Sequence, residues 1–137
     1  MVRFSEAVGR AGPAMMLLWV MVAGGLGSGA RYLIGQWAMA ALGASFPYGT
    51  MIVNLAGSFA LGLVVQLASS GSLSPEMRIA IGAGFLGGFT TYSSFNQDTL
   101  ALMSSGATGT ALANLAVTVI GGLTAGLLGM TLGRAVS

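Results

Sequence analysis

The sequence contains no cysteine, no histidine and no lysine, and charged residues make up only 6% of its 137 positions. Without cysteine the chain forms no disulfide and offers no thiolate to a metal. Without histidine it lacks the commonest general base and metal ligand. Paired carboxylates are also missing, as is a phosphate-binding glycine loop followed by lysine. The sequence therefore predicts no enzymatic site, and five arginines against three acids are too few to indicate a nucleic-acid partner.

Apolar residues dominate the chain instead. Hydrophobic residues make up 55% of the positions and charged residues only 6%. An ordinary soluble domain carries about 25% charged residues. A helix needs about 20 apolar residues to cross the hydrocarbon core of a membrane. Stretches of this kind run at about 14–41, 48–68, 75–103 and 108–133. We therefore predict an all-α membrane protein with four transmembrane helices in a single domain, residues 14–137.

A short polar leader, residues 1–13, precedes the first apolar stretch. The leader and the residues after it could be a signal peptide, but the apolar run is long and its removal would leave three spans. We therefore expect the first span to be retained. Four spans put both termini on one side of the membrane, and that side holds Arg3, Arg10, Arg78 and Arg134. The positive-inside rule then favours cytoplasmic termini.

The chain has 23 glycines, and several recur four residues apart in the apolar stretches. Small residues at this spacing let membrane helices approach closely. The pairs are Gly25/Gly29, Gly84/Gly88, Gly122/Gly126 and Gly129/Gly133. Together they predict a compact helix bundle.

Two ionisable residues, Arg31 and Asp98, lie within the predicted spans. Such residues are costly in a bilayer and by default mark function. The first and third helices run in the same direction, so the two residues are expected at a similar depth. Pairing with each other, reaching the interface, and a direct part in transport all remain open.

Uncharged polar residues form two stripes, each with a spacing of four residues. The second helix carries Thr50, Asn54, Ser58 and Gly62, and the fourth carries Asn114, Thr118, Gly122 and Gly126. Such stripes either hold helices together by hydrogen bonds or line a narrow hydrated path. The two asparagines favour the path, because each amide has two donors and an acceptor that need partners.

The stretch GFLGGFTTYSSFNQD, residues 84–98, is a poor helix interior. Glycine costs about 1 kcal/mol relative to alanine there, and threonine is stiff. We therefore predict a break in the third helix near Gly87-Gly88 and Thr90-Thr91. Backbone freed at membrane depth needs protein, water or an ion as its partner. Freed carbonyls would suit a small cation and freed amides an anion, and Tyr92 follows directly.

Three segments carry a resemblance to a known family. They are GLGSGARYLIG in the first helix, GTMIVNLAGSFALG in the second and GFLGGFTTYSSF in the third. In these segments the sequence resembles the Fluc (CrcB) fluoride channels, and the likeness covers nearly all of the chain after the leader.

The resemblance implies a fluoride-selective channel in the bacterial inner membrane, which exports cytoplasmic fluoride passively and relieves its toxicity. It implies an antiparallel homodimer in the lipid bilayer, with a structural sodium ion held by main-chain carbonyls of Gly87 and Thr90. The pore residues that it implies, with the stripe residue Ser58, are Asn54, Ser58, Tyr92, Phe95, Asn114 and Thr118. Gly122 also falls on the fourth-helix track, and the motif's arginine is Arg31, which we group with Asp98 as structural or vestibule residues.

The sequence departs from the family's pattern at three points. Tyr92 stands where the family has phenylalanine, so the ring edge is kept and a hydroxyl is added. Asn114 stands where a tyrosine is common, and Gly122 where a serine or threonine is frequent. Four of the five arginines are expected on the side of the membrane that holds the termini. Such a charge bias disfavours insertion in both orientations.

The main alternative is a small proton-coupled transporter, an antiparallel dimer like the small multidrug exporters. Its coupling needs a titratable carboxylate early in the first helix, where this chain has none. A proton-coupled fluoride exchanger would likewise need a titratable relay. A purely structural subunit would explain the glycines but not the two polar stripes. A passive channel is therefore the preferred prediction.

Overall fold

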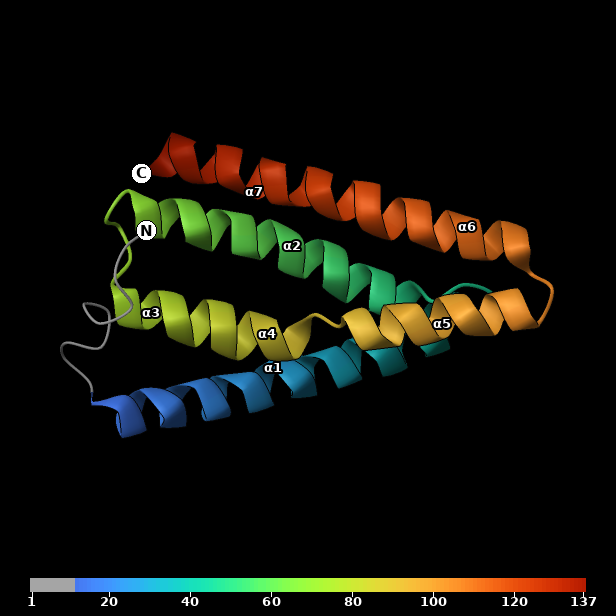
Figure 1. Cartoon of the computed structure of the whole chain (residues 1–137), viewed down its shortest axis with the longest axis horizontal. Coiled ribbons are helices and arrows are strands. Elements are labelled where there is room, and N and C mark those ends of the chain that lie inside the picture. The colour runs from blue at the N-terminus through green and yellow to red at the C-terminus, as the bar shows by residue number, and fades with distance from the viewer. Residues whose placement is uncertain (1–11) are drawn as a thin grey trace.

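The computed structural model describes residues 12–137 and forms four long helical rods joined by short turns (Figure 1). The leader residues Arg3, Glu6 and Arg10 lie outside the described residues. The first two rods are α1 (Pro13–Leu42) and α2 (Tyr48–Ser69). The third consists of α3 (Pro75–Ile79), η1 (Ala80–Leu86), α4 (Gly87–Phe89) and α5 (Tyr92–Ser104). The fourth consists of α6 (Thr108–Ala116), η2 (Val117–Gly121) and α7 (Gly122–Val136). These bounds lie close to the apolar stretches of the sequence.

Local sequence signals set the ends of the rods. The C-terminal ends of α1, α2 and α5 are each followed by a glycine with φ near +80°, at Gly43, Gly71 and Gly106. Glycine adopts this conformation without strain. At the start of α3 the side chain of Ser74 accepts a hydrogen bond from the backbone N–H of Met77 at 3.2 Å, and Pro75 follows it as the first helical residue, as is typical of an N-cap.

Among the described residues, the helices long and apolar enough to cross a membrane are Pro13–Leu42, Tyr48–Ser69 and Thr108–Val136. The third rod is not one continuous helix, because Thr90 and Thr91, between α4 and α5, are not helical. Two of the divisions in the rods are changes of helical pitch: η1 in the third rod and η2 in the fourth are π-helical. Segments of this kind often occur at functional sites.

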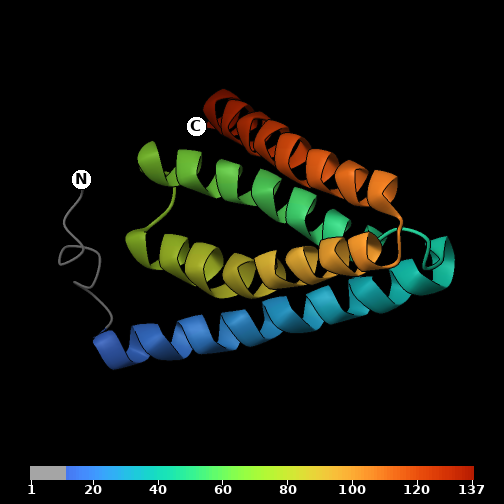
Figure 2. The same ribbon diagram turned by 45° about the vertical axis from the view of Figure 1, so that its right-hand side comes forward.

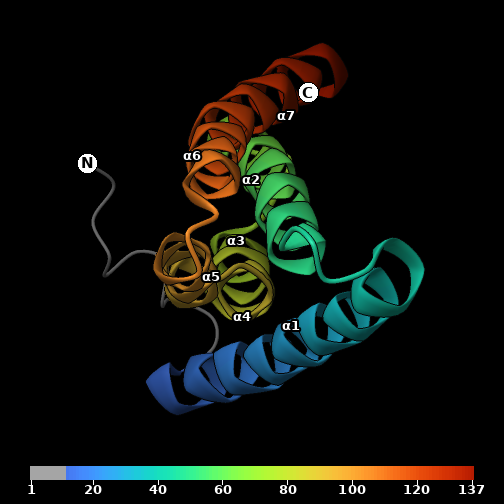
Figure 3. The same ribbon diagram turned by 90° about the vertical axis from the view of Figure 1, so that its right-hand side faces the viewer.

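The four rods pack side by side, each against particular neighbours. Helix α2 lies between α7 and the third rod, and α1 lies against η1 and α4 on the other side (Figures 2 and 3). Glycine makes these contacts possible. A Cβ atom on Gly27 would overlap the carbonyl of Phe85, and one on Gly129 would overlap the carbonyl of Phe59. The backbones therefore approach as closely as the glycine content predicted.

One of the predicted glycine pairs, Gly25/Gly29, makes no close contact between helices of the chain. A Cβ atom added to Gly25 or Gly29 would have no neighbour within 4 Å, whereas one added to Gly27 would meet backbone atoms of the third rod. The contact between α1 and the third rod therefore uses the adjacent helical face, which carries Gly24, Gly27 and Ser28. Spacing alone does not distinguish these two faces, because glycine is frequent on both.

Gly129→Ala tests the packing of α7 on α2. The new methyl group has only backbone atoms of Phe59 and Leu63 to displace, so overpacking should destabilise the protein by about 1–3 kcal/mol. Gly109→Ala is the matched control, since nothing lies within 4 Å of its Cβ position. We expect a lower melting temperature in detergent for Gly129→Ala and an unchanged or higher one for the control. Equal melting temperatures would contradict this packing.

Candidate functional site

The helical backbone of the third rod is interrupted at Thr90 and Thr91. Both residues are extended, with φ and ψ of −81° and 157° at Thr90 and −152° and 113° at Thr91. The last helical hydrogen bond before the interruption runs from the N–H of Thr90 to the carbonyl of Leu86 at 3.0 Å. Beyond it, Thr91 Oγ1 accepts the N–H of Ser94 at 3.1 Å and so caps α5. The interruption is visible as the thin stretch between α4 and α5 in Figure 1.

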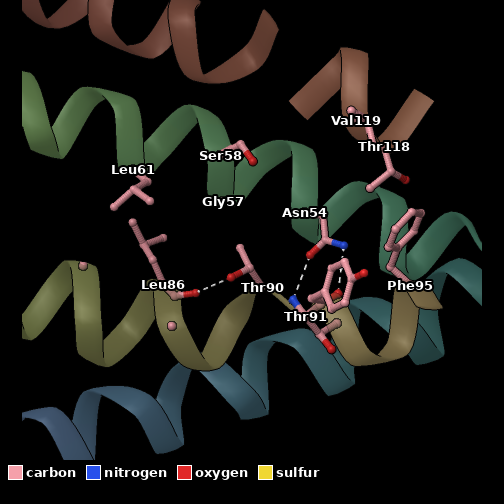
Figure 4. A pocket seen from close by; sticks show the side chains of 13 residues that line it. Asn54, Gly57, Ser58, Leu61, Leu86, Thr90, Thr91, Phe95, Thr118 and Val119 are labelled. Carbon is pink, nitrogen blue, oxygen red and sulfur yellow. Dashed lines mark hydrogen bonds between the residues drawn. The ribbon is translucent and has the colours of Figure 1, made fainter. Parts of the chain in front are cut away.

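Asn54 of α2 binds the interrupted backbone with both ends of its amide (Figure 4). Its Oδ1 accepts the N–H of Thr91 at 2.8 Å, and its Nδ2 donates to the carbonyl of Thr91 at 3.0 Å. One side chain therefore satisfies both main-chain groups of a buried residue that has left the helix. Since Nδ2 carries two hydrogens, this arrangement commits only one of them.

The interruption frees main-chain carbonyl oxygens, among them those of Gly87 and Thr90. In a continuous helix the carbonyl of Gly87 would accept the N–H of Thr91, and the carbonyl of Thr90 that of Ser94. Both N–H groups donate elsewhere, to Asn54 Oδ1 and to Thr91 Oγ1. The carbonyls of Gly87 and Thr90 are thus left without their helical donors, and oxygen ligands of this type suit a hard cation.

A cavity of about 370 Å³ lies beside the interruption, between α2, the third rod and η2 (Figure 4). Of the residues singled out from the sequence, Asn54, Ser58, Gly87, Thr90, Tyr92, Phe95 and Thr118 line it. The other lining residues, which no sequence pattern marked as site residues, are Gly57, Leu61, Gly82, Leu86, Thr91 and Val119. Helical spacing could have indicated Gly57 and Leu61, which lie three and seven positions after Asn54 and share its face.

The aromatic pair of the lining has one buried and one exposed member. The ring centroids of Tyr92 and Phe95 are 5.9 Å apart and the rings are tilted by 56°. Phe95 is buried, whereas Tyr92 is 77% exposed on the surface of the chain. Tilted rings of this kind present positive edges as well as negative faces to their surroundings.

Other predicted site residues lie away from the cavity lining. Asn114 is 0% exposed and donates from Nδ2 to Thr99 Oγ1 at 2.9 Å. Asp98 accepts a hydrogen bond from Thr50 Oγ1 at 2.7 Å, so the partner that the structure gives it within residues 12–137 is Thr50 and not Arg31. Gly122 lies beneath Ser58, whose Oγ would be 3.6 Å from a Cβ atom there. This is an ordinary contact distance, so the structure places Gly122 next to Ser58 but does not require glycine there.

The cavity offers hydrogen-bond donors without charge. The described residues that line it include an amide, several hydroxyls and no charged side chain. A fixed charge would hold a counter-ion tightly, while neutral donors replace part of its water and still let it leave. Such a lining suits the passage of a small anion.

The sequence is similar to several known proteins. Over residues 18–130 it matches the family described as "CrcB-like protein, Camphor Resistance (CrcB)". A protein of Anaeromyxobacter sp. (strain K), named "Fluoride-specific ion channel FluC", is 50% identical over 110 residues, which cover 80% of this chain and 87% of that protein.

Two further relatives carry the same name. The Thermus thermophilus protein is 45% identical over 118 residues, 86% of this chain and 93% of that protein. The Sorangium cellulosum protein is 44% identical over 117 residues, 85% of this chain and 92% of that protein. Since the family match and these identities extend over most of its length, the chain belongs to the CrcB-like family of membrane proteins.

Proposed function

We propose that this chain is the subunit of a fluoride-selective channel, which lets cytoplasmic fluoride leave the cell down its gradient and so relieves fluoride toxicity. The observation that carries the proposal is the uncharged, donor-lined cavity beside Asn54, in a chain whose relatives are named fluoride-specific ion channels. Its family is one of channels, so the chain is not an enzyme. The bacterial relatives and the apolar helices support a multi-pass protein of the inner membrane.

The cavity would replace the water of a strongly hydrated ion. The uncommitted hydrogen of Asn54 Nδ2 and the hydroxyls of Ser58 and Thr118 are the donors for this task. Phe95 and Tyr92 add ring edges, whose positive potential attracts an anion. Because each contact is neutral, the ion would be held loosely enough to move on.

The proposed assembly is an antiparallel homodimer with a structural sodium ion between the subunits. The freed carbonyls of Gly87 and Thr90 support this ion site, because two subunits would together present four such oxygens. The exposure of Tyr92 on the subunit surface supports an interface at the same place. Arg78 and Arg134 lie at the same end of the bundle, so antiparallel pairing would place these charges at both membrane faces.

Arg31 and Asp98 are proposed as structural or vestibule residues. Asp98 lies outside the cavity lining and is tied to α2 through Thr50. That bond joins α5 to the start of α2, at the end of the molecule opposite the start of α1 (Figure 1). Asp98 would therefore act at the approach to the pore rather than in the wall beside Asn54, and Arg31, which also lies outside the cavity lining, is grouped with it.

The deciding experiment measures ion efflux from liposomes that contain the purified protein. We expect fluoride to leave down its gradient, chloride to be retained, and the flux to persist with equal pH on both sides. A small proton-coupled transporter would require a proton gradient. Flux that disappears when the pH gradient is removed would favour that alternative, and a protein that passes no fluoride would overturn the proposal.

Tyr92 offers a test of the aromatic wall. Tyr92→Phe keeps the ring edge and removes only the hydroxyl, so fluoride efflux should stay within about threefold of the wild-type rate. Tyr92→Leu removes the ring and should lower the flux by about fivefold, since an aromatic contact contributes roughly 1 kcal/mol. Rates of efflux for the two variants, reconstituted at equal protein density, check both expectations. If the flux from Tyr92→Leu equalled that from Tyr92→Phe, the ring edge at position 92 would not contribute to fluoride flux.

A further inference from the structure

A chain of hydrogen bonds runs behind the cavity wall and joins two of its lining residues. Thr118 Oγ1 donates to Asn114 Oδ1 at 3.5 Å, and Asn114 Nδ2 donates to Thr99 Oγ1 at 2.9 Å. Thr99 Oγ1 in turn donates to the carbonyl of Phe95 at 2.7 Å. The first and last residues of this chain line the cavity, and Figure 4 draws both at the same end of it. The two middle residues are buried, with Asn114 0% and Thr99 5% exposed.

The direction of every bond in this chain is set from its buried end. Thr99 has one hydroxyl hydrogen, and the carbonyl of Phe95 takes it at short range. The other side of Thr99 Oγ1 must then face a donor, which orients the Asn114 amide with Nδ2 toward Thr99. Oδ1 is thereby turned toward Thr118, so the hydroxyl of Thr118 is a donor on that side.

The bond from Thr118 is long and the other two are short. At 3.5 Å it is near the limit of a useful hydrogen bond, whereas the buried bonds are 2.7 and 2.9 Å. The amide is therefore held firmly from behind, while the hydroxyl hydrogen of Thr118 is held weakly. Little would be lost if that hydrogen turned away from Asn114 toward an anion in the cavity.

We propose that Asn114 and Thr99 are positioning residues, which hold the hydroxyl of Thr118 as a ready donor for the passing anion. This inference rests on the proposed function for the identity of that anion. Asn114 Oδ1 accepts the hydroxyl hydrogen of Thr118 while the cavity holds no ion. When the ion arrives, the hydroxyl turns its hydrogen to the ion, and Thr99 keeps the amide in place for the return.

The transport test is a double-mutant cycle on fluoride efflux from liposomes. Thr99→Val removes the hydroxyl that orients Asn114 and keeps the side-chain shape, so we expect the flux to fall by about tenfold. Thr99→Ser retains the hydroxyl and should restore the rate. In a Thr118→Val background the Thr99→Val change should have less than about a twofold further effect, because the group that it positions is already gone. If the fold-loss of fluoride efflux in the double variant equalled the product of the two single losses, the proposal would be overturned.

Thr124→Val is the matched control for the loss of a hydroxyl. Thr124 Oγ1 donates to the carbonyl four residues earlier, Ile120, at 2.8 Å, just as Thr99 does to Phe95, but Thr124 lies exposed on the outside of α7. Its substitution should leave fluoride flux unchanged. A loss as large as that of Thr99→Val would show that the threonine-to-carbonyl bond alone is responsible, and the positioning role would fall.

A second measurement does not depend on transport. The chain has only three asparagines, at positions 54, 96 and 114, so selective ¹⁵N labelling gives three pairs of side-chain amide signals in NMR spectra, one pair for each NH2 group. Thr118→Val and Thr99→Val should each shift the Asn114 signal without added ion, and Thr124→Val should not. An Asn114 signal unmoved by Thr118→Val would overturn the proposal. If these shifts occurred but the wild-type protein passed no fluoride, the proposed function would be wrong, while the hydrogen-bond chain from Thr118 to Phe95 would be confirmed.

Discussion

Asn54→Leu is expected to lower fluoride efflux by about 100-fold or more. The substitution removes a donor from the cavity wall and leaves the N–H and the carbonyl of Thr91 without the partners that they have at 2.8 and 3.0 Å. An unsatisfied buried polar group costs about 1–3 kcal/mol, and each 1.4 kcal/mol changes a rate about tenfold. Efflux rates from liposomes, with assembly followed by size-exclusion chromatography, measure the effect.

Asn54→Asp separates the two tasks of this side chain. A carboxylate keeps the acceptor for the N–H of Thr91 but sets a second acceptor against the carbonyl of Thr91, where Nδ2 now donates. It also adds a negative charge to an otherwise uncharged lining, so fluoride flux should fall at least as far as in Asn54→Leu. Asn96→Leu is the control, since Asn96 lies exposed on α5. Normal flux from either Asn54 variant would exclude Asn54 from the pore.

Asn54 shows how far the sequence alone could go at the site. Its place in a polar stripe and in the GTMIVNLAGSFALG segment predicted a residue that faces the ion path, and the structure places it in the cavity lining. The sequence did not indicate that the same amide binds both main-chain groups of Thr91. That partnership joins two rods and depends on their relative register, which no local pattern encodes.

The position of the interruption could be predicted more closely than its consequences. Gly87-Gly88 and Thr90-Thr91 are poor helix formers, and the backbone leaves the helix at Thr90 and Thr91 rather than at the glycines. Gly88 instead serves helix packing, because a Cβ atom there would overlap the carbonyl of Gly24. Composition therefore indicated the region, and tertiary contacts decided which residues in it are extended.

The polar stripe of the fourth helix divides between two layers. Thr118 lines the cavity, whereas Asn114, one turn earlier on the same face, is fully buried against Thr99. The change of pitch in η2, which begins at Val117, lies between them and alters the direction in which successive turns face. A spacing of four residues assumes a regular helix, so the sequence could not separate the wall residue from the one behind it.

Gly57→Ala is the second substitution for which we expect a large effect. A Cβ atom on Gly57 would overlap Cγ2 of Thr90, while its next neighbours lie at ordinary distances of 3.4 Å from Phe89 and 3.7 Å from Thr90 Cβ. The methyl group of Thr90 would therefore have to move, and with it the extended backbone that carries the freed carbonyl. Overpacking of this kind costs about 1–3 kcal/mol, so we expect fluoride efflux to fall by about tenfold to 100-fold.

A second substitution, at Thr90, should relieve the overlap that Gly57→Ala creates. Thr90→Ser removes Cγ2 and keeps the hydroxyl that donates to the carbonyl of Leu86 at 2.9 Å, so the double variant Gly57→Ala with Thr90→Ser should recover most of the wild-type flux. Thr90→Ser alone should change the flux little. The coupling between the two sites, measured as a double-mutant cycle on efflux and on melting temperature, should be large because the side chains meet. A double variant no better than Gly57→Ala would mean that Gly57 is needed for another reason than room for Thr90. Recovery of both flux and stability would instead tie conduction to the exact placement of the interrupted backbone, since the only atoms exchanged are two methyl groups at one contact.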